Sequence, residues 1–120
     1  MIIRESGEDY LETILMFCKE RGFARSVDIA THLGVSKPSV SFAMKRLREN
    51  GYILMGDDNR ITLTGEGEAI ACRILERHDL LITMLMRLGV SEETARVDAC
   101  KIEHDLSDET MQAIRQFLKK

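Results

Sequence analysis

Two short segments with apolar residues at helical spacing meet at the tripeptide Gly34-Val35-Ser36, and no other feature constrains the fold as strongly. The first segment is predicted to form a helix over residues 27–33 with Ser26 as its N-cap. The second is predicted to form a helix from about residue 37 to about residue 50, capped by Ser36. Two helices joined by a short glycine-containing turn make a helix-turn-helix.

A β-hairpin is predicted directly after this helix pair. Residues 52–55 are apolar, residues 60–64 alternate between polar and apolar, and the polar segment Gly56-Asp57-Asp58-Asn59 separates them. A hairpin in this position is the wing of a winged helix-turn-helix. In that motif the second helix of the pair enters the major groove of DNA.

Helical periodicity covers most of the remaining sequence. Apolar residues recur at helical spacing over residues 9–19 and from residue 66 to about residue 88. Two further helices are predicted, from about residue 93 to about residue 104 and from Ser107, as N-cap, to residue 118.

These elements define the fold class and the domain organisation. A chain of 120 residues forms one compact domain or two very small ones. The fold class is mainly α with a small β-wing. We expect a winged helix-turn-helix DNA-binding domain over residues 1–65 and a helical domain over residues 66–120.

Charge and hydropathy exclude several classes of protein. The longest apolar runs are far shorter than the roughly 20 residues needed to cross a bilayer, so no membrane segment is expected. The N-terminus lacks the pattern of a signal peptide, which makes the cytoplasm the expected location. The net charge is −3, yet residues 37–60 contain five basic residues and three acidic ones.

This local excess of positive charge lies on the predicted second helix and the wing. Hydroxyl and cationic side chains there can contact phosphates and base edges. The alternative is a solvated basic helix in a winged helix that binds protein. The candidate DNA-binding residues are Ser36, Lys37, Ser39, Ser41, Lys45, Arg48 and Arg60.

A second group of residues points to metal chemistry. Cys100, Glu103 and His104 have the spacing i, i+3, i+4, which places a thiolate, a carboxylate and an imidazole on one helix face. The alternative is a half-buried cysteine beside an exposed Glu-His pair. The three cysteines of the chain are widely spaced and include no CxxC, which argues against a disulfide framework and a zinc ribbon. Cys18 and Cys72 are expected to be buried.

Three further candidate ligands lie elsewhere in the sequence. Asp9 and Glu12 are spaced i, i+3 on the first predicted helix, and His78 follows Arg77 in the long one. Taken singly, such residues are more often solvated carboxylates or core histidines than ligands.

The full set of motifs resembles the diphtheria-toxin-repressor family of metal-dependent regulators, in particular its short, two-domain, manganese-sensing branch. The resemblance spans nearly the whole chain in the family's order. The motifs that carry it are residues 8–12, 24–30, 63–67, 77–78 and 99–107.

The resemblance implies a homodimer that represses metal-uptake genes by binding a palindromic operator when Mn(II) or Fe(II) is bound. The helical domain is then a metal-binding and dimerisation domain. The metal ligands carried over from the family are Asp9, Glu12, His78, Cys100, Glu103 and His104.

The ligand set departs from both branches of the family. The manganese branch has Glu at the position of Cys100, and the iron branch has Met at the position of Asp9. The carboxylate favours Mn(II) and Fe(II), whereas the thiolate is softer, and Zn(II) or Co(II) can substitute. Ile82 and Arg96 replace ligands of the iron branch's ancillary site, which leaves one ion, or a compact pair of ions that share Glu103.

The ligands come from both predicted domains, so a bound metal is expected to hold the two together and select the DNA-competent state. Two alternatives remain. One is a metal-independent winged-helix regulator that responds to a small organic ligand. The other is a small metalloenzyme, which we rank last because the sequence has no HExxH and no separate general base.

Overall fold

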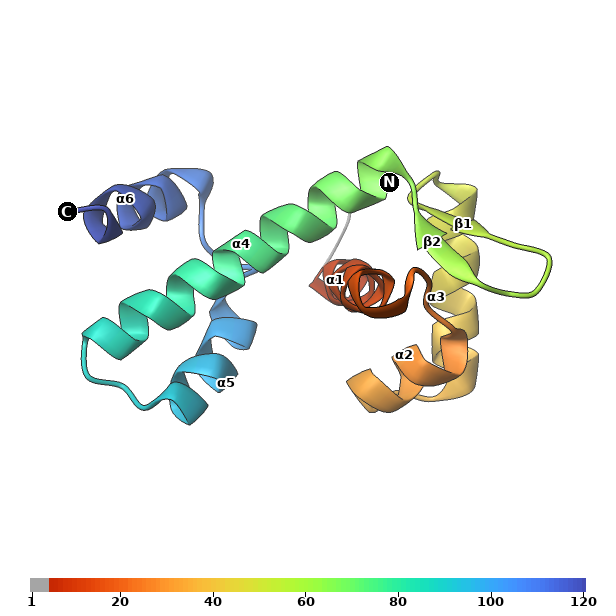
Figure 1. The fold of residues 1–120 in the computed structure, drawn as a ribbon, viewed down its shortest axis with the longest axis horizontal. Coiled ribbons are helices and arrows are strands. Elements are labelled where there is room, and N and C mark those ends of the chain that lie inside the picture. The colour runs from red at the N-terminus through yellow and green to blue at the C-terminus, as the bar shows by residue number, and fades with distance from the viewer. Residues whose placement is uncertain (1–4) are drawn as a thin grey trace. The chain divides into compact units, whose positions relative to one another are not determined.

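The computed structural model describes residues 5–120, which form two compact units with a boundary between Cys72 and Arg73. The N-terminal unit contains three helices, a hairpin and the first turns of a long helix (Figure 1). These elements are α1 (Glu5–Arg21), α2 (Ser26–Leu33), α3 (Lys37–Glu49), β1 (Ile53–Met55), β2 (Ile61–Leu63) and the start of α4 (Gly65–Arg87).

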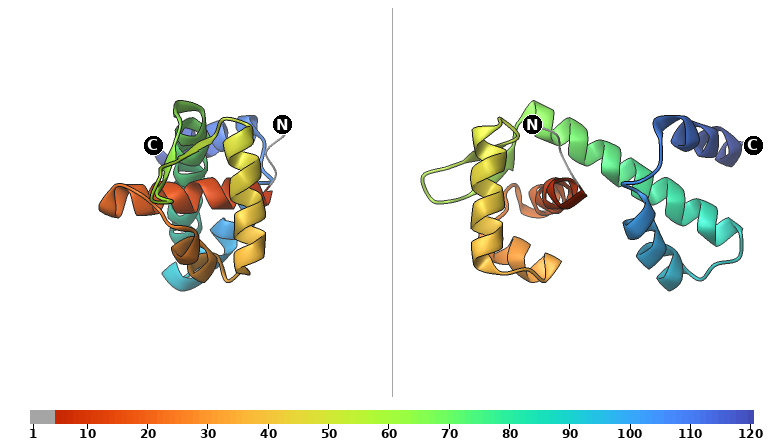
Figure 2. Two further views of the ribbon diagram at one scale, coloured as in Figure 1. Left: turned by 90° about the vertical axis from the view of Figure 1, so that its right-hand side faces the viewer. Right: turned by 180° about the vertical axis from the view of Figure 1, so that it is seen from behind.

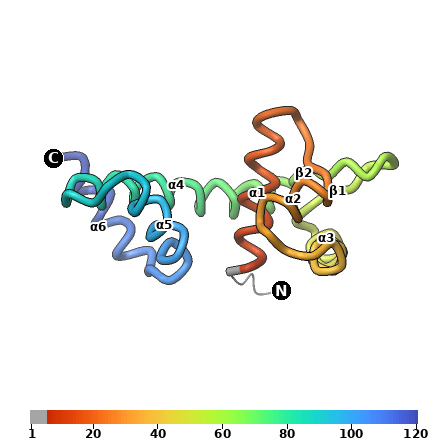
Figure 3. The backbone as a smooth tube through the Cα atoms, turned by 90° about the horizontal axis from the view of Figure 1, so that it is seen from below, coloured from red at the N-terminus to blue at the C-terminus, as the bar shows by residue number. Residues whose placement is uncertain are grey.

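The predicted helix-turn-helix and wing are both present. Residues 34–36 join α2 to α3 (Figure 3), and α1 crosses α3 (Figure 2). Strands β1 and β2 are antiparallel, with Ile53 opposite Leu63 and Met55 opposite Ile61. The loop between the strands extends away from the helices of this unit, as a wing does (Figure 1).

The core of the N-terminal unit is apolar and draws on every one of its elements before α4. On α3 the buried residues recur at helical spacing, which leaves the opposite face of the helix exposed. Fully buried side chains include Leu11, Ile14, Ile29, Val40, Met44, Leu47, Ile53 and Ile61.

Side-chain caps explain where some of these helices begin. Ser36 is the N-cap of α3, as predicted, and its hydroxyl accepts a hydrogen bond from the Ser39 amide. The prediction that Ser26 caps α2 is wrong, because Ser26 is already helical and Arg25 occupies the cap position without a side-chain hydrogen bond. The segment before α2 is held instead by a β-bridge in which Ala24 and Ile61 exchange two backbone hydrogen bonds.

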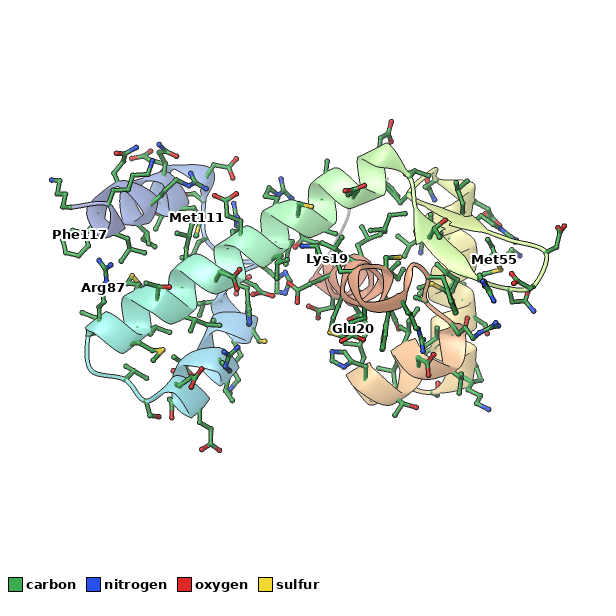
Figure 4. All side chains as sticks on the ribbon, in the orientation of Figure 1. Lys19, Glu20, Met55, Arg87, Met111 and Phe117 are labelled. Carbon is green, nitrogen blue, oxygen red and sulfur yellow. The ribbon has the colours of Figure 1, made fainter. Side chains whose placement is uncertain are left out.

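The C-terminal unit contains the rest of α4, α5 (Glu92–Ile102) and α6 (Asp108–Leu118). Ser91 and Ser107 cap α5 and α6 through their hydroxyls. Side chains from all three helices form one apolar cluster, and Met111 of α6 is part of it (Figure 4). The buried members of the cluster are Leu81, Ile82, Ala95, Ala99 and Met111.

Two further predictions are wrong. Helix α5 ends at Ile102, not at His104, and Glu103 is its C-cap. Cys72, the last residue of the N-terminal unit, is exposed and Cys18 is only partly buried, whereas the sequence suggested that both are buried. No helix among residues 5–120 is long and apolar enough to cross a membrane.

Candidate metal centre and nucleic-acid interface

The C-terminal unit brings together the candidate ligands of α4 and α5. His78 Nδ1, on α4, lies 2.8 Å from Glu103 Oε2. Cys100 Sγ, in the last turn of α5, lies 3.8 Å from the same nitrogen of His78. A nitrogen, an oxygen and a sulfur donor therefore lie within one small volume.

Glu103 is at the centre of this group. Its other carboxylate oxygen, Oε1, lies 3.4 Å from His104 Nε2, so one imidazole flanks each oxygen. The side chains of Glu103 and His104 are only 1% and 2% exposed. A carboxylate buried this deeply is costly unless a positive charge or strong hydrogen bonds compensate it.

The exposure of these residues is the reverse of the half-buried Cys and exposed Glu-His pair considered from the sequence. Cys100 is exposed and Glu103 is buried. Although α5 ends at Ile102, one residue before Glu103, the backbone of Glu103 keeps helical angles (φ −60°, ψ −25°). The i, i+3 relation between Cys100 and Glu103 is therefore retained. His104 lies in the turn that follows.

Arg77 fixes the backbone of this turn, a role that the sequence analysis missed. Its Nη1 donates to the carbonyl oxygens of Glu103 (3.0 Å) and Leu106 (2.7 Å), and its Nη2 donates to Asp108 Oδ1 (2.6 Å). The sequence signal was present, because Arg77 lies between Ile74 and Leu81 on the buried stripe of α4. An arginine on such a stripe needs acceptors inside the protein.

The donor set fits a divalent transition metal. Ligands bound to one ion at about 2.0–2.3 Å lie roughly 3–4 Å from one another. The distances of 2.8 Å, 3.4 Å and 3.8 Å among His78, Glu103, His104 and Cys100 are close to this range. Two imidazoles suit Fe(II), Zn(II) and Co(II), the carboxylate suits Mn(II), and the thiolate favours the softer ions.

The remaining two candidate ligands belong to the N-terminal unit. Asp9 and Glu12 lie on α1, both partly buried and one helical turn apart. The backbone of this turn is regular, and the Asp9 carbonyl also accepts a hydrogen bond of 2.8 Å from the Thr13 hydroxyl. Two carboxylates at this spacing face the same side of the helix.

The candidate DNA-binding residues lie on the exposed side of α3 and beside it. Ser41, Lys45 and Arg48 line a groove of about 450 Å³ together with Arg25 from the N-cap of α2 and Asn59 from the wing. Among the described residues that line this groove, three are cationic and none is acidic. It therefore offers a positive surface to a phosphate backbone.

Two candidate residues at the start of α3, Ser36 and Ser39, are hydrogen-bonded to each other. The Ser36 hydroxyl accepts from the Ser39 amide and donates to the Ser39 hydroxyl at 2.8 Å. Lys37 occupies the first helical position and is exposed. The cap fixes the backbone at the N-terminal end of α3, where the first amide groups have no acceptor within the helix.

Arg60, the candidate on the wing, is held in place by two contacts. Its Nε lies 2.7 Å from Asp58 Oδ2, and its guanidinium lies 4.3 Å from the centre of the Phe23 ring. Arg25 contacts the same ring at 5.3 Å, and it donates to the Asp58 carbonyl at 3.1 Å. Arg21 also contacts this ring, at 5.1 Å, so three guanidinium groups pack against one phenyl ring.

Both units match models of one protein family. Residues 3–58 match the N-terminal DNA-binding domain of the iron-dependent repressors, and residues 64–120 match their metal-binding and dimerisation domain. The transcriptional regulator MntR of Escherichia coli O6:H1 is 45% identical over 117 residues, which cover 98% of this chain and 76% of the relative.

Solved structures agree with this assignment. The IdeR structure of T. acidophilum has a TM-score of 0.83 and 26% identity, with coverage of 94% of this chain and 54% of that one. The manganese regulator SloR has a TM-score of 0.84 and 27% identity, with coverage of 99% and 55%. The chain thus spans little more than half the length of these solved chains. On the evidence of both domain models and of the relatives, the chain belongs to the iron-dependent repressor family, a family of transcriptional regulators and not of enzymes.

Proposed function

We propose that this protein is a metal-dependent repressor that binds the operators of Mn(II) or Fe(II) uptake genes when a divalent metal is bound. The observation that carries the proposal is the buried Glu103 carboxylate with an imidazole at each oxygen, in a chain whose other unit presents a basic groove beside a helix-turn-helix. The domain boundaries we propose are 1–65 for DNA binding and 66–120 for metal binding and dimerisation.

We assign the metal to six residues from the two units. His78, Cys100, Glu103 and His104 form the part described above, and the carboxylates of Asp9 and Glu12 complete the set. A bound divalent cation supplies the positive charge that three carboxylates in one site require. Without it, Asp9, Glu12 and Glu103 repel one another, which favours separation of α1 from the C-terminal ligands.

The proposed partners follow from the same scheme. A homodimer presents two copies of α3, and a palindromic operator presents two half-sites about one helical turn, roughly 34 Å, apart. Holding α1 to the C-terminal unit restricts the distance between the two copies. A coupling of about 1–3 kcal/mol per site is enough to change operator affinity measurably. We propose a cytoplasmic location, without association with membranes.

The donor chemistry leads us to propose Mn(II) or Fe(II) as the physiological ion. Glu103, Asp9 and Glu12 are hard oxygen donors, which favour these two ions. Cys100 extends the range of ions that the site accepts toward Zn(II) and Co(II). The name of the matching domain family, which mentions iron, and that of the solved manganese regulator SloR agree with this range.

The proposal is tested by fluorescence anisotropy of a labelled promoter fragment, titrated with the protein under anaerobic conditions. Separate titrations contain a chelator, Mn(II), Fe(II), Co(II) or Zn(II). We expect binding only with one or more of the metals. Equal binding in the chelator would overturn the metal switch and favour a winged-helix regulator that responds to a small organic ligand.

A further inference from the structure

Phe42 is a large apolar side chain on the exposed face of α3. Its side chain is 63% exposed, whereas Val40 and Met44, two residues before and after it, are buried in the core. The core of the unit is therefore complete without Phe42.

The neighbours of Phe42 on α3 are cationic. The Arg46 guanidinium lies 5.8 Å from the centre of the Phe42 ring, within the range of a cation–π contact. Lys45 is exposed beside them, and Glu49 at the end of α3 is the helix's one acidic residue. These cations attract phosphates, but a phenyl ring gains nothing from a phosphate.

The major groove offers one apolar group to such a ring. Among the four bases only thymine carries a methyl group, at C5, and the other groups that distinguish the base pairs in the major groove are hydrogen-bond donors and acceptors. A phenyl ring cannot satisfy a donor or an acceptor, so its contact with the groove is favourable only where the methyl group lies. In the major groove, Phe42 can therefore distinguish thymine from the other bases by burying its methyl group, and not by hydrogen bonding.

We infer that Phe42 contacts the C5 methyl group of a thymine in each half-site and selects that base at one operator position. The inference rests on the proposed function, because it requires α3 to enter the major groove. The contact with Arg46 restricts the Phe42 ring from one side and leaves the rest of its surface for the base.

The test begins with selection of the preferred duplex from a random library by the metal-loaded protein. Each thymine of the selected site is then replaced singly by uracil, which removes the methyl group and keeps base pairing. We expect one thymine per half-site at which the replacement weakens wild-type binding about fourfold, the value of one buried methyl group. Replacement at the other thymines leaves the affinity nearly unchanged.

The protein side of the test uses Phe42→Ala and Phe42→Leu. Phe42→Ala should bind the thymine and uracil duplexes equally, while Phe42→Leu keeps part of the discrimination. Phe117→Ala is the matched control, because Phe117 is 66% exposed on α6 in the other unit. It should keep the full fourfold sensitivity, whatever its effect on overall affinity.

Two results would overturn the inference alone. One is wild-type binding that is insensitive to uracil at every thymine, and the other is Phe42→Ala with the full sensitivity of the wild type. In both cases metal-stimulated binding of the selected duplex persists, so the proposed function stands. Loss of metal-stimulated binding in the wild type would overturn the function and the inference together.

Discussion

His78 Nδ1 and Glu103 Oε2 are 2.8 Å apart, and this contact joins α4 to the turn that follows α5. It links two residues separated by 25 positions in the sequence. The apolar cluster of the C-terminal unit holds both elements, so the contact forms as the unit folds. The unit therefore presents an imidazole and a carboxylate to an ion at nearly the mutual distance that coordination needs.

Glu103→Gln keeps the size of the side chain and removes its charge. We expect metal affinity to fall by more than the roughly 10–100-fold that loss of an outer hydrogen-bond partner costs, and metal-stimulated DNA binding to disappear. Isothermal titration with Mn(II) and Co(II) measures the first effect, and anisotropy measures the second. Glu93→Gln, an exposed change on α5, is the control. Unchanged stimulation in Glu103→Gln would refute the assignment of this ligand.

Arg77→Lys removes most of the hydrogen bonds that fix the turn after α5. We expect metal affinity to fall about 10–100-fold and the free energy of unfolding to fall by about 1–3 kcal/mol. Saturating metal should restore DNA binding, because Arg77 positions the ligands and is not itself a ligand. Competition with a fluorescent chelator measures the affinity, and Arg96→Lys is the exposed control. Lower stability with unchanged metal affinity would limit Arg77 to a structural role.

Lys45→Ala removes one cation from the groove beside α3. If Lys45 contacts a phosphate, affinity falls equally for all duplex sequences. The slope of log affinity against log salt concentration then becomes shallower by about 0.9 per lost contact. Lys101→Ala, an exposed change on α5, should leave the slope unchanged. A changed base preference in Lys45→Ala would show instead that Lys45 contacts base edges.

Cys18 makes the stability of the fold depend on pH, and this dependence does not involve metal. Burial raises the pKa of its thiol, and its Sγ lies 3.9 Å from the Ile61 carbonyl oxygen. The Cys18 thiol therefore ionises at lower pH in the unfolded chain than in the folded one. The contribution of Cys18 to stability is complete below about pH 8.5, the ordinary thiol value, and is lost as pH rises through the raised pKa. Urea unfolding of wild type and Cys18→Ala between pH 7 and 10 should show a steeper decline for the wild type.

Local patterns were sufficient to predict most of the N-terminal unit. The turn at Gly34, the Ser36 cap and the polar tip of the wing depend on neighbouring residues, so the sequence contains their cause. The start of α2 was mispredicted because the pairing of Ala24 with Ile61, 37 positions away, fixes the chain before the helix. Ser26 alone carries no sign of that pairing.

The C-terminal unit illustrates the same limit at the candidate metal centre. Helical spacing suggested that α5 continues to His104, yet it ends at Ile102. The guanidinium of Arg77, 26 positions earlier than Glu103, accounts for the difference because it binds the carbonyl oxygens of Glu103 and Leu106. Residue types predicted the candidate ligands, whereas the arrangement of their backbone depends on a contact that spacing cannot reveal.

The shared Phe23 ring has a consequence for the entropy of binding. A free arginine side chain carries about 2 kcal/mol of rotamer entropy, which it loses when it grips a phosphate. Arg25 and Arg60 are already restrained in the folded unit by the ring and by Asp58. Both side chains are therefore largely ordered before a polyanion binds. The loss of side-chain entropy on binding is smaller as a result, and it offsets less of the electrostatic attraction.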